Sequence, residues 1–352
     1  MILLRAVQES DIGGLEHLSA LAAERHPGFL NVPADTEGWR ERIRFSHKSF
    51  AGDFEDGQAA KFIFVAEDLN TRSIVGVSMV SSQHGTKDSP HFYFQVDSEQ
   101  KFSETINTGF IHGTLKLKID TDGPTEIGGL LVDPTVRNTE ERVGRQISFV
   151  RFLYIGLHQN LFKRRVLAEL LPPLTKKGKS PLWEAVGRRF TNMDYWEADY
   201  LSSKNKEFIL SLFPSGKIYV TFLPAEARNA IGKVSKETEP VMHMLKKIGF
   251  KYLNQVDPFD GGPHLMANVD DIPPIKKIAS LVYAGEKHDL PQEQAAEHQL
   301  VLQGLVTARS EQGFRAISTA LNFSNDRAYF EKSKATILGL KPGDQIQFMP
   351  YY

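Results

Sequence analysis

One stretch near the middle of the chain, residues 125–158, constrains the fold more than any other part. It begins with an apolar run, Ile127 to Val132, which ends at Asp133-Pro134 because proline cannot donate a hydrogen bond to a neighbouring strand. A polar loop, Thr135 to Arg142, follows. After Gly144, apolar residues recur every three to four positions, which is the period of a helix that packs on one face. The stretch therefore predicts a strand, a loop and a helix in succession.

The loop before this helix is suited to hold a phosphate group. The first N–H groups of a helix have no partner within the helix and lie at the positive end of its dipole. Arg142 and Arg145 add two cations, and Gly144 lets the backbone approach a ligand closely. The alternative is an ordinary strand–helix unit with a solvated basic loop. No Walker lysine motif and no G-x-G-x-x-G after a strand occurs, which disfavours the usual ATP and NAD sites.

Short segments along most of the chain occur in the same order in one known family. They are VPAD (32–35), RIRFSHKSF (42–50), FIFVAED (62–68), LLVDP (130–134), GRQISFVRFLY (144–154), AEL (168–170), GKSPLWEAVGRRF (178–190), ADYLS (198–202), IGKV (231–234), GFKY (249–252) and FDGGPHL (259–265). Through these segments the chain resembles the arginine N-succinyltransferase family, and residues 125–158 resemble the acyl-CoA-binding motif of GCN5-related N-acyltransferases. The resemblance implies an α+β fold with a mixed sheet flanked by helices. It also implies an enzyme of arginine catabolism, with succinyl-CoA as donor and the α-amine of L-arginine as acceptor.

The chain departs from the family's pattern in four places, one of which is the loop before Gly144, about two residues longer than in the family. Ser235 stands where the family has a histidine assigned as proton donor. Residues 170–175 replace a run that contains an arginine and an aspartate in the family, and Gln95 replaces another arginine. These departures leave two alternatives open: an N-acyltransferase with a different amine or acyl-CoA, or a catalytically impaired CoA-binding subunit.

Acyl transfer from a thioester to an amine needs a base for the amine, a donor to the thioester oxygen and a proton for the thiolate. Glu126 is the candidate base, and the alternative is a surface glutamate at a strand end. The resemblance places acyl-CoA at Leu130 and Val132, with the Leu130 N–H as the expected donor. Ser235 occupies the place of the missing acid. Three other groups could substitute for it, although no spacing selects one: Tyr195, His243 and His264.

Asp257 and Asp260 form a second candidate site, at the end of a predicted strand and before Gly-Gly-Pro. Two carboxylates at such a position can hold a guanidinium group by paired hydrogen bonds. The alternative is that both bond to the backbone of their own turn, as turn aspartates commonly do.

Composition and charge exclude several classes of protein. The 42 basic and 43 acidic residues nearly cancel, so no nucleic-acid surface is indicated. The sequence has no apolar run of about 18 residues and no signal peptide, so we expect no membrane span and a cytoplasmic location. With no cysteine and no H-E-x-x-H motif, we expect no disulfide, cysteine nucleophile or catalytic metal, and no permanently bound cofactor beyond the acyl-CoA cosubstrate.

Two domains are predicted: an N-acyltransferase-like domain over residues 1–272, which two divergent halves could make up, and a small β-rich domain over residues 273–352. The second could be a barrel or an extension of the first domain's sheet. Its predicted strands are Ile278–Tyr283, Gln299–Thr307, Phe314–Leu321, Ala335–Leu338 and Gln345–Met349. Within the first domain, residues 36–50 are predicted as a helix with Trp39, Ile43 and Ser46 on one face. Ser180 and Pro181 start another predicted helix, with Trp183, Val186 and Phe190 on one face, and Lys217–Phe222 are predicted as a strand. Homo-oligomers and hetero-oligomers are both compatible with the sequence.

Overall fold

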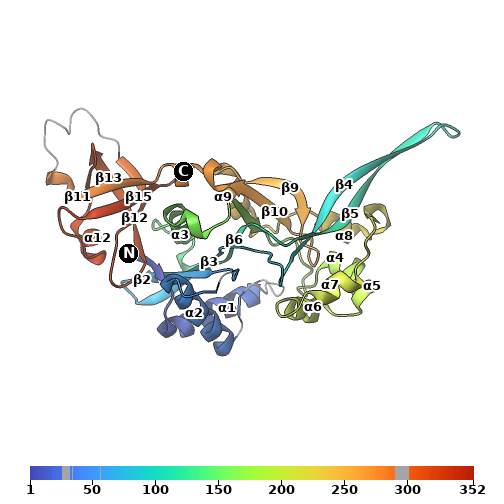
Figure 1. Cartoon of the computed structure of the whole chain (residues 1–352), viewed down its shortest axis with the longest axis horizontal. Coiled ribbons are helices and arrows are strands. Elements are labelled where there is room, and N and C mark those ends of the chain that lie inside the picture. The colour runs from blue at the N-terminus through green and yellow to red at the C-terminus, as the bar shows by residue number, and fades with distance from the viewer. Residues whose placement is uncertain (26–31, 34, 56, 290–300) are drawn as a thin grey trace.

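The computed structural model describes residues 1–25, 32, 33, 35–55, 57–289 and 301–352. Within these residues, strands join into one 15-stranded sheet in the order β12-β15-β11-β14-β13-β1-β2-β3-β6-β7-β10-β9-β4-β5-β8. The molecule is elongated, with the C-terminal strands at one end and the β4–β5 ribbon projecting at the other (Figure 1). The predicted α+β class is confirmed.

The strands are β1 (Ile2–Ala6), β2 (Lys61–Asp68), β3 (Ser73–Ser81), β4 (His91–Ser103), β5 (Thr108–Asp120), β6 (Thr125–Val132), β7 (Arg165–Glu169), β8 (Ile218–Tyr219), β9 (Lys251–Val256), β10 (Pro263–Asn268), β11 (Ala279–Gly285), β12 (Val301–Thr307), β13 (Arg315–Ser324), β14 (Arg327–Tyr329) and β15 (Gln345–Pro350). The described α-helices are α1 (Ile12–Arg25), α2 (Thr36–Ala51), α3 (Val143–Leu157), α4 (Pro181–Ala185), α5 (Gly187–Thr191), α6 (Tyr195–Ser202), α7 (Glu207–Leu212), α8 (Ala225–Ala230), α9 (Glu239–Lys247), α10 (Pro273–Lys276) and α12 (Lys332–Ile337). None of these helices is long and apolar enough to cross a membrane.

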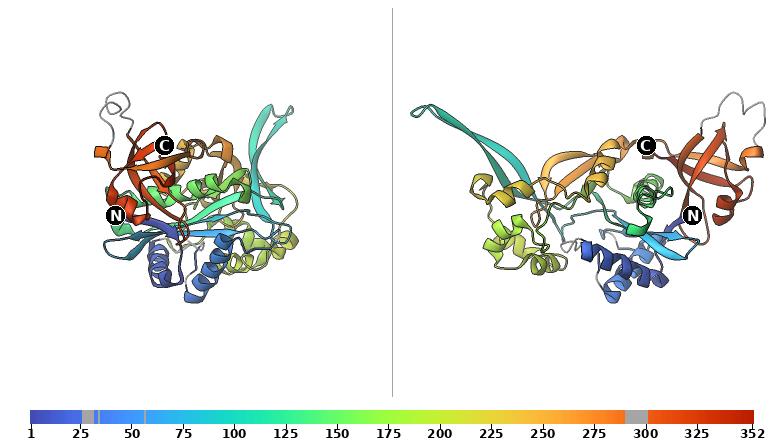
Figure 2. Two further views of the ribbon diagram at one scale, coloured as in Figure 1. Left: turned by 60° about the vertical axis from the view of Figure 1, so that its left-hand side comes forward. Right: turned by 180° about the vertical axis from the view of Figure 1, so that it is seen from behind.

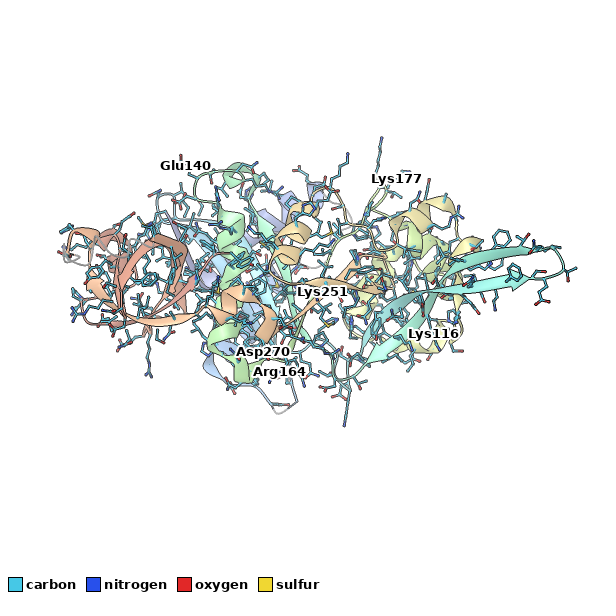
Figure 3. All side chains as sticks on the ribbon, turned by 90° about the horizontal axis from the view of Figure 1, so that it is seen from above. Lys116, Glu140, Arg164, Lys177, Lys251 and Asp270 are labelled. Carbon is cyan, nitrogen blue, oxygen red and sulfur yellow. The ribbon has the colours of Figure 1, made fainter. Side chains whose placement is uncertain are left out.

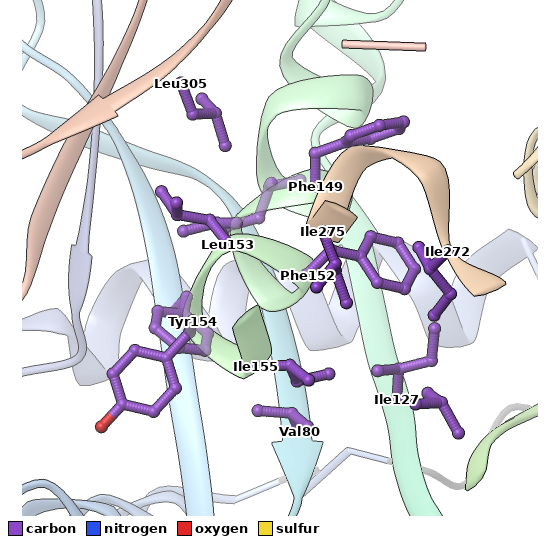
Figure 4. Close-up of a cluster of buried hydrophobic side chains, with 14 of the residues drawn as sticks. Val80, Ile127, Phe149, Phe152, Leu153, Tyr154, Ile155, Ile272, Ile275 and Leu305 are labelled. Carbon is purple, nitrogen blue, oxygen red and sulfur yellow. The ribbon is translucent and has the colours of Figure 1, made fainter. Parts of the chain in front are cut away.

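The predicted strand, loop and helix at the centre of the chain are β6, the loop after it and α3. Helix α3 lies on one face of the central strands, and α1 and α2 lie on the other (Figures 1 and 2). Every residue of α3 from Gln146 to Ile155 is buried. Figure 4 shows why: Phe152 faces Ile272 and Ile275 near α10, while Leu153 lies beneath Leu305 of β12. A helix covered on all sides fixes the position of its own N-terminus.

Local sequence signals determine where helix α2, which packs on the opposite face of the sheet from α3, begins and ends. The Asp35 side chain accepts a hydrogen bond from the Gly38 N–H at 2.7 Å and caps the helix, and Gly52, at φ 74°, ends it. Trp39 and Ile43 are buried on the face predicted from the sequence. The helix therefore fixes the orientation of the exposed Arg44 and of the half-buried Arg40 and Arg42.

The C-terminal strands close into a small barrel. Strand β12 pairs with β13 and β15, β11 pairs with β14 and β15, and β13 pairs with β14, which completes the ring. Strand β13 also pairs with β1, so the barrel continues the main sheet as well. The strand predicted at Ala335–Leu338 is wrong, because Lys332–Ile337 form α12. Gln299 and Leu300, at the start of another predicted strand, lie outside the described residues.

The opposite end differs from the sequence prediction in detail. Strands β4 and β5 pair antiparallel over their whole length and form the projecting ribbon. The single helix predicted after Ser180 is two short helices, α4 and α5, and Phe190 is exposed rather than on a buried face. The strand predicted at Lys217–Phe222 is reduced to the two residues of β8 and a 3₁₀ turn.

Candidate active site

The open edge of β6 is the central feature of the site. Strands β6 and β7 run parallel and pair only at Thr125 with Val166 and at Glu126 with Leu167. Beyond these two pairs, β6 continues to pair with β3, and β7 continues to pair with β10. The two parallel strands therefore separate from each other. Residues 128–132 are only half-buried although they lie in the middle of the sheet. The backbone edge between the strands is therefore accessible to a ligand.

A bulge in β6 shapes this edge. The register with β3 shifts between the pairs Val77–Leu131 and Met79–Gly128. Gly129 lies inside the shift at φ 55°, and a Cβ there would lie 2.8 Å from Met79 Cγ. Both the backbone angle and the contact favour glycine at this position. The bulge precedes Leu130, whose backbone the sequence selected as a donor.

The other end of the open edge meets the N-terminus of α3. A Cβ on Gly144 would lie 3.8 Å from Val132 Cγ2, so the helix N-terminus adjoins the end of β6. Arg142 precedes the helix at φ 48°, none of the side chains that the structure describes caps the helix, and its first turn has no acidic residue. The positive end of the dipole is therefore free to bind an anion. Arg142 is exposed at this point, whereas the Arg145 guanidinium lies 4.1 Å from the centre of the Tyr351 ring.

Glu126 stands where β6 and β7 separate, and His84 is its partner. Glu126 Oε2 lies 2.8 Å from His84 Nδ1, and the two side chains remain 26% and 23% exposed. Burial alone would raise the pKa of Glu126, but the charge and hydrogen bond of His84, with Lys61 and Lys206, lower it to about 2. Burial would lower the pKa of His84, but the charge and hydrogen bond of Glu126 raise it. Glu126 is thus an ionised carboxylate in a site that water reaches.

Glu169, at the end of β7, lies among three histidines. Its Oε1 is 3.7 Å from His84 Nε2, 3.7 Å from His91 Nδ1 and 3.5 Å from His264 Nε2. Burial lowers the pKa of His91, and it lowers the pKa of His264 to about 3, in both cases with the charge of His84 acting in the same direction. Burial raises the pKa of Glu169 to about 8, against the charge of His84 and with the charge of Glu126. These side chains extend the site from β6 to β7 and β10.

Asp257 and Asp260 bond to their own turn, as the alternative interpretation predicted. Asp257 Oδ1 accepts from the N–H groups of Phe259, at 2.7 Å, and Asp260, at 3.0 Å, and Asp260 Oδ1 accepts from Gly262 N–H at 2.7 Å. Burial raises the pKa of both carboxyl groups, and for Asp260 the charge of Asp257 adds to it. An oxygen of Asp257 lies within 4.8 Å of donor atoms of Glu169 and His264, so this turn borders the histidine cluster.

Ser235 lies next to the residues that follow β7. Its N–H donates to the Leu171 carbonyl at 2.9 Å, and its hydroxyl lies 2.9 Å from that of Thr238. Of the other candidate acids, His264 belongs to the cluster, and burial raises the pKa of Tyr195 well above its usual value. His84, His91 and Glu169 were not predicted from the sequence. They lie on the β3–β4 connection, β4 and β7, so no local spacing joins them.

A cavity of about 970 Å³ lies elsewhere, between α1, β1 and the start of β13. Arg5 in its wall is paired with Asp11 and Glu67, each at 2.8 Å. Charges that satisfy one another in this way offer little for a charged substrate. We therefore place the chemistry at the open edge of β6, which lacks such pairing at the helix N-terminus.

A central strand that separates from its parallel neighbour, next to an uncapped helix N-terminus, defines an acyl-CoA-dependent N-acyltransferase. The chain belongs to the arginine N-succinyltransferase family. The family model "Arginine N-succinyltransferase beta subunit" matches residues 2–274. Arginine N-succinyltransferase of Yersinia pseudotuberculosis serotype O:3 (strain YPIII) is 31% identical over 353 residues, covering 100% of this chain and 98% of the relative. The enzyme of the same name from Enterobacter sp. (strain 638) is 31% identical over 350 residues, covering 99% and 97%.

One solved structure agrees with this family in fold. Arginine/ornithine succinyltransferase subunit AI from Pseudomonas aeruginosa matches with a TM-score of 0.82 and 25% sequence identity, over 100% of this chain and 99% of that chain. The family recognised from the sequence is therefore confirmed, together with the class of enzyme and its acyl-CoA cosubstrate.

Proposed function

We propose that this protein transfers the succinyl group of succinyl-CoA to the α-amine of L-arginine, in the cytoplasm. The observation that carries the proposal is the open edge of β6, which runs from Glu126 at its closed end to the uncapped N-terminus of α3. The relatives named for arginine or arginine/ornithine support the choice of amine.

Acyl-CoA would lie along this edge. The diphosphate would accept hydrogen bonds from the first N–H groups of α3, with the Arg142 guanidinium beside it. The amides of the pantetheine arm would pair with backbone groups at Leu130 and Val132, and the Leu130 N–H would donate to the thioester carbonyl. Arg145 would contact the diphosphate only if its side chain moved, because its guanidinium lies over the Tyr351 ring.

Glu126 would accept the proton of the attacking amine, directly or through water. The amine nitrogen forms a bond to the thioester carbonyl carbon, and the carbon–sulfur bond breaks. The CoA thiolate takes a proton from water, while the proton accepted by Glu126 returns to water, so the step balances. The charge and hydrogen bond of His84 hold the pKa of Glu126 low, so its carboxylate is ionised and able to accept a hydrogen bond from the amine at neutral pH. The negative charge of this carboxylate also favours an approaching ammonium group.

The turn at Asp257 and Asp260 would receive the guanidinium group. These carboxyl groups and Asp199 form an acidic region, in which burial raises the pKa of Asp199 to about 6 with help from the charge of Asp257. Lys206 is the cation whose charge acts on Asp257 and Asp199. A cationic side chain would add positive charge to this region, and guanidinium suits two neighbouring carboxylates.

The test is thiol release from succinyl-CoA with each of a panel of amines, with the product identified by mass spectrometry. We expect thiol release to depend on L-arginine and to yield N-succinylarginine. Faster turnover with another amine, such as ornithine, or with acetyl-CoA would replace the proposed substrates. CoA binding without turnover of any amine would instead indicate a CoA-binding subunit.

Arg142→Ala is expected to weaken CoA binding by about tenfold, the usual effect of losing one charge-assisted contact. Titration calorimetry with CoA measures it directly. Arg164→Ala is the matched control, because Arg164 is 82% exposed and paired with Asp270 away from the helix N-terminus (Figure 3). Equal affinities for the two variants would remove Arg142 from the site.

Ser235→His is expected to raise kcat by roughly tenfold, a fraction of what a well-positioned acid contributes. The Ser235 hydroxyl lies against Thr238 and is a poor acid, whereas an imidazole can protonate the departing thiolate. Steady-state thiol release at saturating substrates is the measurement, with Ser235→Ala as control. A Ser235→His variant no faster than wild type would show that thiolate protonation does not limit turnover.

A further inference from the structure

We propose that His84, His91 and Glu169 bind a divalent transition-metal ion of the zinc class, with His264 and Asp257 bordering the site. The inference concerns metal binding alone and does not depend on acyl transfer. It departs from the sequence prediction of no catalytic metal, which rested on the lack of a local ligand motif.

The distances fit an ion better than they fit hydrogen bonds. The nitrogens His84 Nε2 and His91 Nδ1 each lie 3.7 Å from Glu169 Oε1, which is beyond hydrogen-bond range. Zinc takes nitrogen and oxygen ligands at about 2.1 Å, so ligands at the corners of its tetrahedron are about 3.4 Å apart. One donor atom from each of the three residues lies within 4.8 Å of the other two. A small inward movement would complete three-ligand coordination and leave a position open.

The hydrogen bond of His84 directs its second nitrogen into the site. Its Nδ1 lies 2.8 Å from Glu126 Oε2, so this nitrogen carries the proton of the neutral ring. The Nε2 atom then offers its lone pair on the side of Glu169, and a bound ion would take the place of any proton there. A carboxylate that holds the far nitrogen of a ligand histidine is the common arrangement around protein-bound zinc. Glu126 would thus orient a ligand as well as serve at the end of the open edge.

His264 provides an independent observation. It is fully buried, and neither of its ring nitrogens has a hydrogen-bond partner among the described residues. An unpaired buried imidazole is unfavourable, so such a group calls for a partner. Its Nε2 lies 3.5 Å from Glu169 Oε1, and it forms a second three-residue group with Glu169 and Asp257. The ion, or a water bound to it, would supply that partner.

Charge and access favour the same ion. Glu126, Glu169 and Asp257 offer three carboxyl groups to a dication, and the charge of Lys206, like that of a protonated His84, acts on all three. Imidazole and carboxylate ligands together suit zinc and its neighbours rather than calcium or magnesium. His84 and Glu169 are 23% and 25% exposed, so an ion can enter, whereas His91 is 4% exposed and closes the inner side of the site.

The experiment measures metal binding by the untagged full-length chain, without acyl-CoA. After chelation and dialysis, ZnCl₂ is titrated by calorimetry and retained zinc is measured by mass spectrometry; CoCl₂ then reports coordination by visible absorption. We expect about one ion per chain and the intense absorption of tetrahedral cobalt. Glu169→Gln and His84→Gln should each weaken binding at least tenfold.

His288→Ala is the matched control, because His288 also lies near two carboxylates, Glu286 and Asp289, but is 75% exposed. Its zinc affinity should equal that of wild type. Circular dichroism shows whether each variant is folded. If a histidine variant unfolds, Glu169→Gln still tests the proposal, because glutamine has nearly the same shape as glutamate. Substoichiometric zinc, or equal affinity in Glu169→Gln and wild type, would overturn the proposal while leaving thiol release as a separate question.

Discussion

Replacing Glu126 with glutamine is expected to lower kcat for acyl transfer by about 10² to 10³-fold, within the range that a positioned general base contributes. The amide keeps the shape of the side chain but can neither accept the amine's proton nor hold a negative charge beside His84. Because Glu126 lies at the closed end of the open edge, far along β6 from the helix N-terminus, the KM for acyl-CoA should change little. Steady-state thiol release at saturating L-arginine measures both constants.

Glu226→Gln is the control for this substitution, since Glu226 is an exposed glutamate in the first turn of α8. It should behave as wild type. If Glu126→Gln retained most of the wild-type kcat, the carboxylate would be a structural partner of His84 only, and another group would have to receive the proton.

Gly123→Ala is expected to lower both stability and activity, because it displaces the backbone segment that carries His84. A Cβ on Gly123 would lie 1.8 Å from the His84 carbonyl oxygen, so the two segments must move apart. Two backbone hydrogen bonds hold the segments together: Gly123 N–H donates to the Gly85 carbonyl, and His84 N–H donates to the Pro124 carbonyl. We expect a loss of about 1–3 kcal/mol in the free energy of unfolding, typical of overpacking, and a fall in kcat/KM of roughly tenfold or more.

Urea unfolding and steady-state kinetics check the two parts of this expectation. Gly13→Ala is the control, because a Cβ there meets nothing within 4 Å and alanine is favoured over glycine in a helix, here at the second residue of α1. That variant should be as active as wild type and about 0.5–1 kcal/mol more stable. A Gly123→Ala protein with unchanged stability and activity would show that the His84 segment tolerates displacement.

The parts of the fold that the sequence predicted well are those with strong local signals. Strand β6 and helix α3 followed from one apolar run, a proline and a helical period, and the structure confirms both. The failures are short elements whose form depends on their neighbours. Residues 332–337 form a helix where a strand was expected, and residues 217–222 contribute only two residues to the edge of the sheet.

The candidate site divides in the same way. Glu126, Leu130 and Gly144 belong to one continuous stretch, so sequence alone brought them together. Glu169 meets His91 and His264 only because β7 pairs with β10 and the β4 strand joins the same sheet, which is tertiary information. The contact of Arg145 with Tyr351 likewise depends on how the C-terminal residues return to α3.

The most direct measurement of the central claim is a crystal structure of the protein with CoA. We predict that the diphosphate lies on the first N–H groups of α3 beside Arg142, and that the pantetheine arm follows β6 past Leu130 toward Glu126. CoA bound elsewhere, for example in the cavity lined by Arg5 and Arg315, with the edge between β6 and β7 empty, would contradict the account.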